Sequence, residues 1–383
     1  MRKTIDIGDL GTIITGKTPP TTNKNYYGDY AVFIKPTDIS EHSKYTYETE
    51  EMYSKLAAEK YESSLIPKGA ICVPCIGTIG TKMTMAPCDC YTNQSINSII
   101  CNENYDNEYV YYLIKNFLPG LKAYNLGTAS GREYVSKSNF EKIELVAEQD
   151  KEIQKKIGII LSRYDSLIEN YQKQIKLLEE AAQRLYKEWF VDLHFPGHEN
   201  TNIIDGIPEG WEKKKVGDLI AKVPRSKQIP TKDYQKEGMI PIIDQSRDYI
   251  AGYTDDIESK VESNEPYIVF GDHTRVLKYV PFAFAKGADG TQLIMSNNLD
   301  LMPQCLLFTS LVNIDLSNYS YARHFKYLKE EEFIVPTSLI ANVFSKHVAK
   351  WYVKIQQNRE QLRLLTEARD RLLPKLMSGA IEV

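Results

Sequence analysis

Four cysteines form the densest group of side chains in this 383-residue chain that could do chemistry. Cys72, Cys75, Cys88 and Cys90 fall within 19 residues, and four thiolates could close a tetrahedral zinc site. Cys72, however, lies in an apolar run that predicts a strand, and Cys88 and Cys90 are closely spaced for two ligands of one ion. Packing as buried free thiols is therefore the favoured interpretation, with zinc as the alternative. We assign no metal site.

Arginines outside the expected helices form a second group. Five of them lie in polar, turn-like stretches that also hold lysine, threonine, asparagine and glutamine. Arginine on a loop is the usual reader of guanine, and asparagine or glutamine that of adenine. One at a time, most such residues are solvated surface charges, so only their shared placement indicates DNA binding. The candidate DNA-binding residues are Lys17, Thr18, Lys35, Thr78, Lys82, Asn93, Gln94, Arg132, Arg225, Gln245, Arg247, His273, Arg275, Arg323 and Lys326.

No catalytic motif accompanies these residues. The sequence lacks the phosphate-binding loop of ATPases, the dinucleotide-binding G-x-G-x-x-G and the G-x-S-x-G nucleophile elbow. It also lacks the Asn-Pro-Pro-aromatic motif with which amino-methylating DNA enzymes hold a flipped base. Residues 258–260 (ESK) match half of a nuclease signature, but the preceding Pro-Asp is missing, and such a pair on a loop is usually solvated surface. We expect no catalytic residues and no enzyme activity in this chain.

Composition is that of a globular protein, with 42% hydrophobic and 26% charged residues. No apolar run approaches the roughly 20 residues that span a bilayer, and the first ten residues are no signal peptide. Six cysteines in so long a chain fit a reducing compartment, so we expect a cytoplasmic protein of a bacterium or archaeon.

The net charge of −4 gives no support for non-specific binding to DNA. Residues 194–338 hold 16 basic and 21 acidic residues, whereas residues 339–383 hold 8 and 4. Any DNA contact must therefore come from local clusters or from partner subunits.

The elements that must position these residues belong to an internal sequence repeat. The sequence IDIGDLGTI at 5–13 recurs as KKVGDLIAK at 214–222, an offset of 209, and KLLEEA at 176–181 recurs as RLLTEA at 363–368, an offset of 187. Two matches in the same order indicate a duplicated unit, each a globular segment followed by a long helix.

Both helices carry apolar residues at heptad spacing, with one polar seam residue each, Gln174 and Asn358. Forty residues of helix reach roughly 60 Å, and so long a seam needs a partner of equal length. The other helix of the same chain is the expected partner. The alternative is that each helix packs on its own domain. The seam positions are Ile153, Ile157, Ile160, Tyr164, Leu167, Tyr171, Leu178, Ala181 and Leu185 in the first helix, and Phe344, Val348, Trp351, Ile355, Leu362, Leu365 and Leu372 in the second.

The globular segments are expected to be mixed, mainly β, because short apolar runs alternate with turn signals. The Gly- and Pro-rich residues 190–211 predict a linker between the repeats. The expected division is a first domain at 1–147, a helix at 148–193, a second domain at 194–338 and a second helix at 339–383.

Several segments resemble the DNA-specificity subunit of type I restriction–modification systems. Residues 372–379 (LLPKLMSG) are similar to the family's C-terminal signature, and residues 182–190 (AQRLYKEWF) with 194–197 (HFPG) to its central conserved region. Residues 207–211 (IPEGW) resemble the usual entry to a target-recognition domain. Weaker matches are GTIG at 77–80, NQS at 93–95 and YARHFK at 321–326.

This resemblance implies an α+β fold with a pseudo-twofold internal repeat, in which two long helices form an antiparallel intrachain coiled coil that separates two mixed, mainly β target-recognition domains. It implies a non-catalytic subunit that binds double-stranded DNA, reads a bipartite target and assembles with two modification (methyltransferase) subunits and restriction subunits. S-adenosylmethionine, ATP and Mg are then expected on the partners, with no cofactor on this chain.

Overall fold

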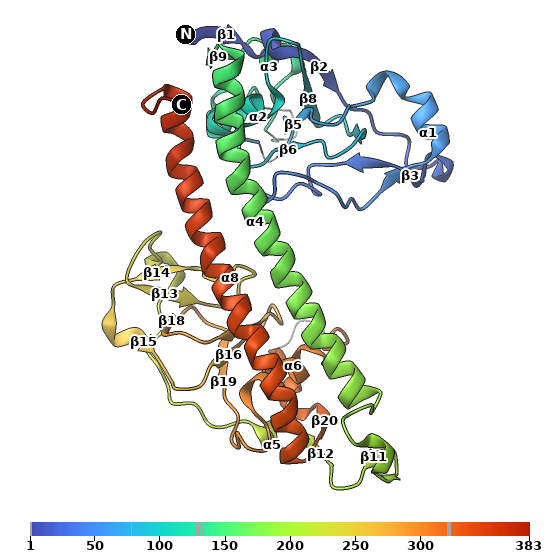
Figure 1. The fold of residues 1–383 in the computed structure, drawn as a ribbon, viewed down its shortest axis with the longest axis vertical. Helices are drawn as coiled ribbons and strands as arrows, with labels where there is room; N and C mark the ends of the chain where they lie inside the picture. Colours follow the sequence, from blue (N-terminus) through green and yellow to red (C-terminus); the bar gives the residue numbers. More distant parts are fainter. Residues whose placement is uncertain (1, 78, 128–130, 132, 320–322) are drawn as a thin grey trace. The chain divides into compact units, whose positions relative to one another are not determined.

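The computed structural model describes residues 2–77, 79–127, 131, 133–319 and 323–383, and Figure 1 shows its helices and strands. The expected α+β class is confirmed, because the chain combines several small sheets, built from runs of consecutive strands, with separate helices. The chain forms two compact units, residues 1–171 with 361–383 and residues 172–360. These units divide both long helices, whereas the sequence-based division gives each helix a segment of its own; that division stays a prediction.

The first unit is built on three small sheets. Strands pair in the orders β1-β9, β2-β8-β5-β6 and β4-β3-β7. Its elements are β1 (Arg2–Asp6), β2 (Gly11–Thr15), β3 (Tyr27–Ile34), β4 (Met52–Tyr53), α1 (Lys55–Lys60), β5 (Ile71–Pro74), β6 (Thr84–Met85), β7 (Tyr91–Thr92), β8 (Ile96–Cys101), α2 (Asn107–Phe117), α3 (Lys137–Glu141), β9 (Glu144–Glu148) and the first part of α4 (Lys151–Tyr186).

The second unit repeats this plan with further strands. Strands pair in the orders β10-β11, β12-β20, β14-β13-β18-β15 and β17-β16-β19. Its elements are β10 (Ile203–Ile204), β11 (Ile207–Pro208), β12 (Glu212–Lys215), α5 (Val216–Leu219), β13 (Ile240–Ile243), β14 (Gly252–Thr254), β15 (Lys260–Val261), β16 (Tyr267–Gly271), β17 (Leu277–Val280), β18 (Phe284–Lys286), β19 (Thr291–Ile294), α6 (Gln304–Val312), α7 (His324–Glu330), β20 (Glu332–Val335) and α8 (Ser338–Ser378), whose last part belongs to the first unit.

The internal repeat is confirmed by matching elements in the two units. The antiparallel pair β1-β9 has its counterpart in the antiparallel pair β12-β20, and α3 and α4 have theirs in α7 and α8. The offset of 187 that relates residues 176–181 to residues 363–368 also relates the first residues of α3 and α7 and those of α4 and α8. The duplication therefore extends from sequence to fold.

The antiparallel pairing of the two long helices is visible within each unit. In the second unit, the Asn358 Nδ2 donates to Gln174 Oε1 over 3.2 Å, so the polar residues of the two seams are in contact. Toward the start of α8, Phe344 packs edge-on against Tyr186 of α4. Positions that rise along one helix thus fall along the other, which is the antiparallel arrangement.

The seam of α4 is broader than its heptad predicts. Leu167, expected in the seam, is 46% exposed, whereas Asp165 and Ile168 are buried. The reason is that this part of α4 packs both on α8 and on the globular part of its own unit, since one core cluster holds Ile157 and Leu161 together with Leu373 of α8 and the tyrosines of α2. A helix with two packing partners buries a wider face than a two-position stripe.

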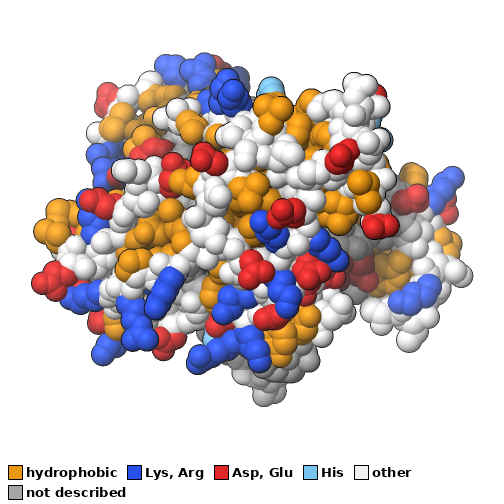
Figure 2. Space-filling model, turned by 90° about the horizontal axis from the view of Figure 1, so that it is seen from below, with side chains coloured by type: hydrophobic (Ala, Val, Ile, Leu, Met, Phe, Trp, Pro, Cys, Tyr) orange, Lys and Arg blue, Asp and Glu red, His pale blue; other side chains and the backbone are white. Residues whose placement is uncertain are grey.

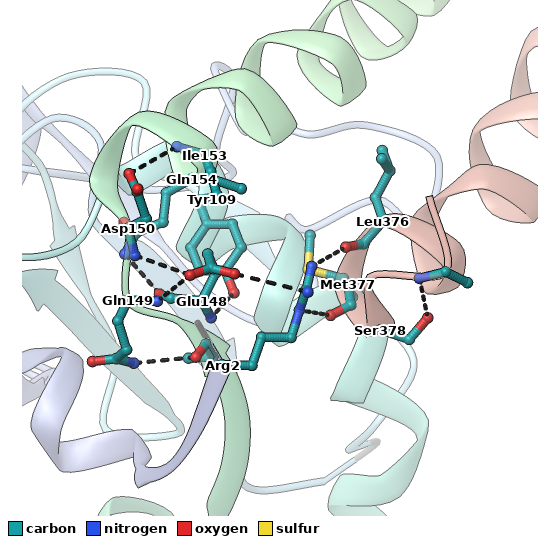
Figure 3. A network of polar contacts seen from close by, with 12 residues as sticks. Arg2, Tyr109, Glu148, Gln149, Asp150, Ile153, Gln154, Leu376, Met377 and Ser378 are labelled. Atoms are coloured by element: carbon teal, nitrogen blue, oxygen red, sulfur yellow. Dashed lines mark hydrogen bonds and ion pairs between the residues drawn. The ribbon is translucent and has the colours of Figure 1, made fainter. Parts of the chain in front are cut away.

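Arg2 fastens the first strand of the first unit to the end of α8 (Figure 3). Its Nε and Nη2 donate to the carbonyl oxygens of Met377 and Leu376 over 2.9 and 3.0 Å, and its Nη1 lies 3.8 Å from buried Glu148. At Gly379, which has a φ of +78°, a Cβ would lie 2.1 Å from Arg2 Nη1. Glycine there both ends the helix and admits the guanidinium.

Among the described residues, no helix is long and apolar enough to cross a membrane.

Candidate nucleic-acid interface

Two polar loops of the first unit, predicted separately from the sequence, meet in the structure. The Lys17 N–H donates to the Thr92 carbonyl over 2.9 Å, and the Thr18 hydroxyl hydrogen-bonds the Gln94 side chain. Gly16 makes this approach possible, because a Cβ there would lie 2.1 Å from the Thr92 oxygen. The ends of β2 and β7 thereby present Lys17, Thr18 and Gln94 together at the surface.

Asn93 has a local role beside this group, because its side-chain oxygen accepts the Ser95 N–H over 3.1 Å in the turn before β8. Lys82 is half-buried in the segment before β6. Thr78 and Arg132 lie outside the described residues, as do the first two residues of the segment 321–326.

Lys35 has its charge compensated within the chain. Its Nζ lies 2.7 Å from Glu50 and 3.2 Å from Glu51. Burial alone would lower the pKa of Lys35, but the hydrogen bonds with the two carboxylates outweigh it and the pKa is raised. Such an ammonium has less capacity to attract a phosphate than Lys17, for which no ion pair is found among the described residues.

Gln245 acts in the second unit as a clamp between loops. Its Nε2 donates to the Asp289 carbonyl over 2.9 Å, and its Oε1 accepts the His273 N–H over 3.1 Å. The Thr274 hydroxyl donates to the Gln245 carbonyl over 2.6 Å. The amide that the sequence marks as an adenine reader is therefore engaged in holding the exposed His273 loop, a role that only the fold reveals.

Asp272 joins two segments that carry candidate DNA-binding residues. Its carbonyl accepts the backbone N–H of His324 over 3.0 Å, and its carboxylate accepts the Phe325 N–H over 2.8 Å. Residues 271–275 thus lie against the start of α7. Four exposed candidates, His273, Arg275, Arg323 and Lys326, are positioned by this contact.

Arg275 is held in an uncommon backbone conformation. Its φ is +62°, in the left-handed region that few non-glycine residues occupy. Its Nη1 donates to the Leu316 carbonyl over 3.1 Å, which leaves other guanidinium N–H groups for a ligand. Arg247 and Arg225 are exposed elsewhere in the unit, in the turn after β13 and in the segment after α5.

Lys278 is the buried cation beneath the Gln245 turn. Burial lowers its pKa from 10.5 to about 8, against the attraction of Asp244, whose Oδ1 lies 3.8 Å away. Between these two pH values the unfolded chain binds a proton that the folded chain does not, so stability rises with pH. We expect the unfolding free energy of the natural chain, measured against that of Lys278→Met by denaturant titration, to be flat below pH 8 and to climb above it. A difference that stays flat throughout would contradict the assignment.

Three of the four clustered cysteines pack as small apolar groups, as predicted, whereas Cys88 is exposed, so the expectation of a buried thiol is wrong for Cys88. Cys72, Cys75 and Cys90 are buried, and Cys72 accepts a hydrogen bond from Ser98 over 3.4 Å. Burial raises the pKa of Cys72 to about 11, so the side chain stays a neutral thiol. Within the part of the chain that the structure describes, no three His, Cys, Asp or Glu side chains gather in a way that could hold a metal ion.

Surface charge is mixed rather than uniformly basic. On the face shown in Figure 2, Lys and Arg side chains are interspersed with Asp and Glu. This pattern agrees with the acidic total charge, and it limits DNA attraction on this face to small groups of cations.

Comparison with known proteins gives consistent relatives. Residues 2–180 match the family model described as the type I restriction modification DNA specificity domain. The MjaIX type I restriction enzyme specificity subunit of Methanocaldococcus jannaschii is 29% identical over 405 aligned residues, covering 98% of this chain and 93% of that protein. The HindI specificity subunit of Haemophilus influenzae is 38% identical over 165 residues, 41% of this chain and 35% of that protein.

The fold is also found in a solved structure. The type I restriction–modification S subunit from M. genitalium superposes with a TM-score of 0.62 at 16% identity, covering 98% of this chain and 96% of that one. At this identity the match shows a shared fold over nearly the whole length of both chains.

Proposed function

The chain belongs to the type I restriction–modification DNA-specificity family and confers DNA sequence specificity, and from this premise we propose that it reads a bipartite DNA target, with one half-site for each globular domain. The domain within residues 1–147 reads one half and the domain within 194–338 the other, while the paired helices set the spacing between them. The chain itself is not a catalyst. Two modification subunits with S-adenosylmethionine methylate adenine, and restriction subunits with ATP and Mg cleave the DNA.

The internal repeat is the observation that carries this proposal. Each unit has its own sheet core, its own terminal strand pair and its own stretch of antiparallel helix pairing. Two equivalent units that differ in their loops are what a chain needs to read two different short sequences at a fixed distance. A protein that bound one continuous site would not need the second copy.

The two half-sites should differ in chemistry. Four of the five loop arginines lie in the second domain, so its half-site should rely more on guanine contacts. The first domain offers Lys17, Thr18 and Gln94 at the meeting of two loops, which favours weaker guanine readout and more contacts with adenine.

A genome-wide methylation map tests the proposal. A host that expresses this chain with its modification subunits should show a split, asymmetric adenine-methylated motif that a strain without the chain lacks. Replacing residues 1–147 with the equivalent domain of a relative should change one half of that motif, and replacing residues 194–338 should change the other half. A methylome that does not depend on the chain would refute the proposal, and a swap that altered both halves would refute the division of labour.

A further inference from the structure

The two units differ where the chain enters the central sheet. In the first unit, β2 pairs with β8 along five residues, from Gly11 opposite Cys101 to Thr15 opposite Asn97. In the second unit the equivalent pairing is a single bridge between Ile220 and Ser296. The chain then leaves the edge of β19 and forms its next bridge at Gln228, opposite Lys286. Pro224, which has no N–H to donate, lies in the departing segment.

The departure opens a groove of about 700 Å³ between residues 220–228, β18, β19 and α7. Four cations line it, namely Lys222, Arg225, Lys286 and Lys329. No acidic side chain is among its described lining residues, although residues 194–338 carry an excess of five negative charges. The groove is thus a local basic site in an acidic domain, the kind of cluster that the overall charge requires of a DNA-binding chain.

The groove cations lack carboxylate partners in the described part of the unit, whereas several nearby lysines have them. Lys215 pairs with Glu330, and Lys227, next to the groove, pairs with Asp256 over 2.7 Å and Glu258 over 3.4 Å. Among the described residues, none of the four groove cations lies within 4 Å of a carboxylate oxygen. No carboxylate of the described residues is therefore close enough to offset the repulsion between these four positive charges.

Two further details fit an anionic occupant. The Ser226 Oγ is buried and has no hydrogen-bond partner in the described part of the chain, which leaves a hydroxyl donor on the groove wall. The Lys329 ammonium lies 5.3 Å from the centre of the Phe325 ring, which also lines the groove and orients this cation. Amides of Gln228 and Gln292 add further donors.

We propose that this groove binds the phosphodiester backbone of DNA beside the half-site read by the second domain, with the four cations on the phosphates. The inference rests on the proposed function and adds its phosphate-contact site. It also assigns Arg225 to backbone positioning rather than to guanine reading, because it shares the groove with three lysines instead of standing alone on a loop.

The test is the salt dependence of DNA binding by the complete complex of this chain with its modification subunits. Lys329→Gln and Arg225→Gln are compared with the natural chain on duplexes with and without the methylated motif, by fluorescence anisotropy at several salt concentrations. A lost phosphate contact should weaken binding to both duplexes roughly 5–10-fold near 0.1 M salt and lower the slope of log K against log[salt] by about 0.9. The double variant should lower the slope by about two.

Matched variants separate this effect from a general loss of charge or fold. Lys227→Gln removes a neighbouring cation that is already paired outside the groove, and should leave the slope unchanged. Lys329→Arg keeps the charge and should bind nearly as the natural chain does. Equal slopes for Lys329→Gln and Lys227→Gln would overturn the groove assignment, and so would a changed motif in the methylation map, which would indicate base reading. Failure of the natural chain to direct methylation would instead refute the proposed function itself.

Discussion

Replacing Arg369 with leucine is expected to lower the unfolding free energy of the first unit by about 3–5 kcal/mol, the usual cost of leaving one partner of a buried ion pair alone. Arg369 and Asp165 are 7% and 4% exposed, and their Nη1 and Oδ1 atoms lie 2.5 Å apart. The Tyr112 hydroxyl donates to the other oxygen of Asp165 over 2.5 Å. Without Arg369, the carboxylate keeps one hydrogen bond and loses its counter-charge.

The location of the tryptophans makes this measurement selective. All three tryptophans, Trp189, Trp211 and Trp351, belong to the second unit, so their fluorescence follows that unit alone. In urea, Arg369→Leu should shift the far-UV circular dichroism transition of the first unit while the fluorescence transition moves little.

Two matched variants complete this experiment. The double variant Asp165→Asn with Arg369→Leu should recover part of the loss, because the unpaired charge is gone. Arg371→Leu, at an exposed pair on the same helix, should cost at most about 0.5 kcal/mol. Equal losses for Arg369→Leu and Arg371→Leu would contradict the role of the buried pair.

Phe344→Ala is expected to destabilise the second unit by about 3–5 kcal/mol. The Phe344 side chain is fully buried, with its ring centre 5.1 Å from that of Phe190 and 5.8 Å from that of Trp189. Removal of the ring loses burial and edge-to-face contacts and leaves a cavity between α4 and α8.

Tryptophan fluorescence reads this change directly, since Trp189 borders the lost ring. The urea midpoint should fall and the native emission should shift. Leu339→Ala, five residues earlier on α8 and 73% exposed, is the control and should change the midpoint little. A Phe344→Ala midpoint as high as that of the control would show that the aromatic cluster does not hold the helix pair together in this unit.

The helices and their polar seam residues could be predicted from sequence because heptad spacing is a local property. Two long helices, α4 and α8, are present as the heptads predicted, and the polar residue identified in each seam, Gln174 or Asn358, is hydrogen-bonded to the other. The seam of α4 near Asp165 could not be predicted. A carboxylate in a helix reads as solvent-facing, and its partner Arg369 lies 204 residues further along the chain.

The candidate site was predictable in part for a similar reason. Residue type alone marked Thr18 and Gln94, and the fold brings them together. Residue type could not show that the Gln245 amide is engaged in hydrogen bonds between two loops rather than free to contact a DNA base. Of the four groove cations, the sequence identified only Arg225 as a candidate. Lys286 and Lys329 lie on a strand and a helix more than 60 and 100 residues further along the chain, so only the fold brings them to the groove.

The division of both helices between two units also sets an order of events during synthesis. Residues 151–171 of α4 are synthesised before residues 172–360, and residues 361–383, which complete their unit, are synthesised after them. At about 5–20 residues per second, the apolar face of Ile157 and Leu161 waits roughly 10–40 s for its partner helix. The first unit therefore starts to be synthesised first but is completed last. During that interval, the face of α4 that packs on the end of α8 has no partner helix in the nascent chain.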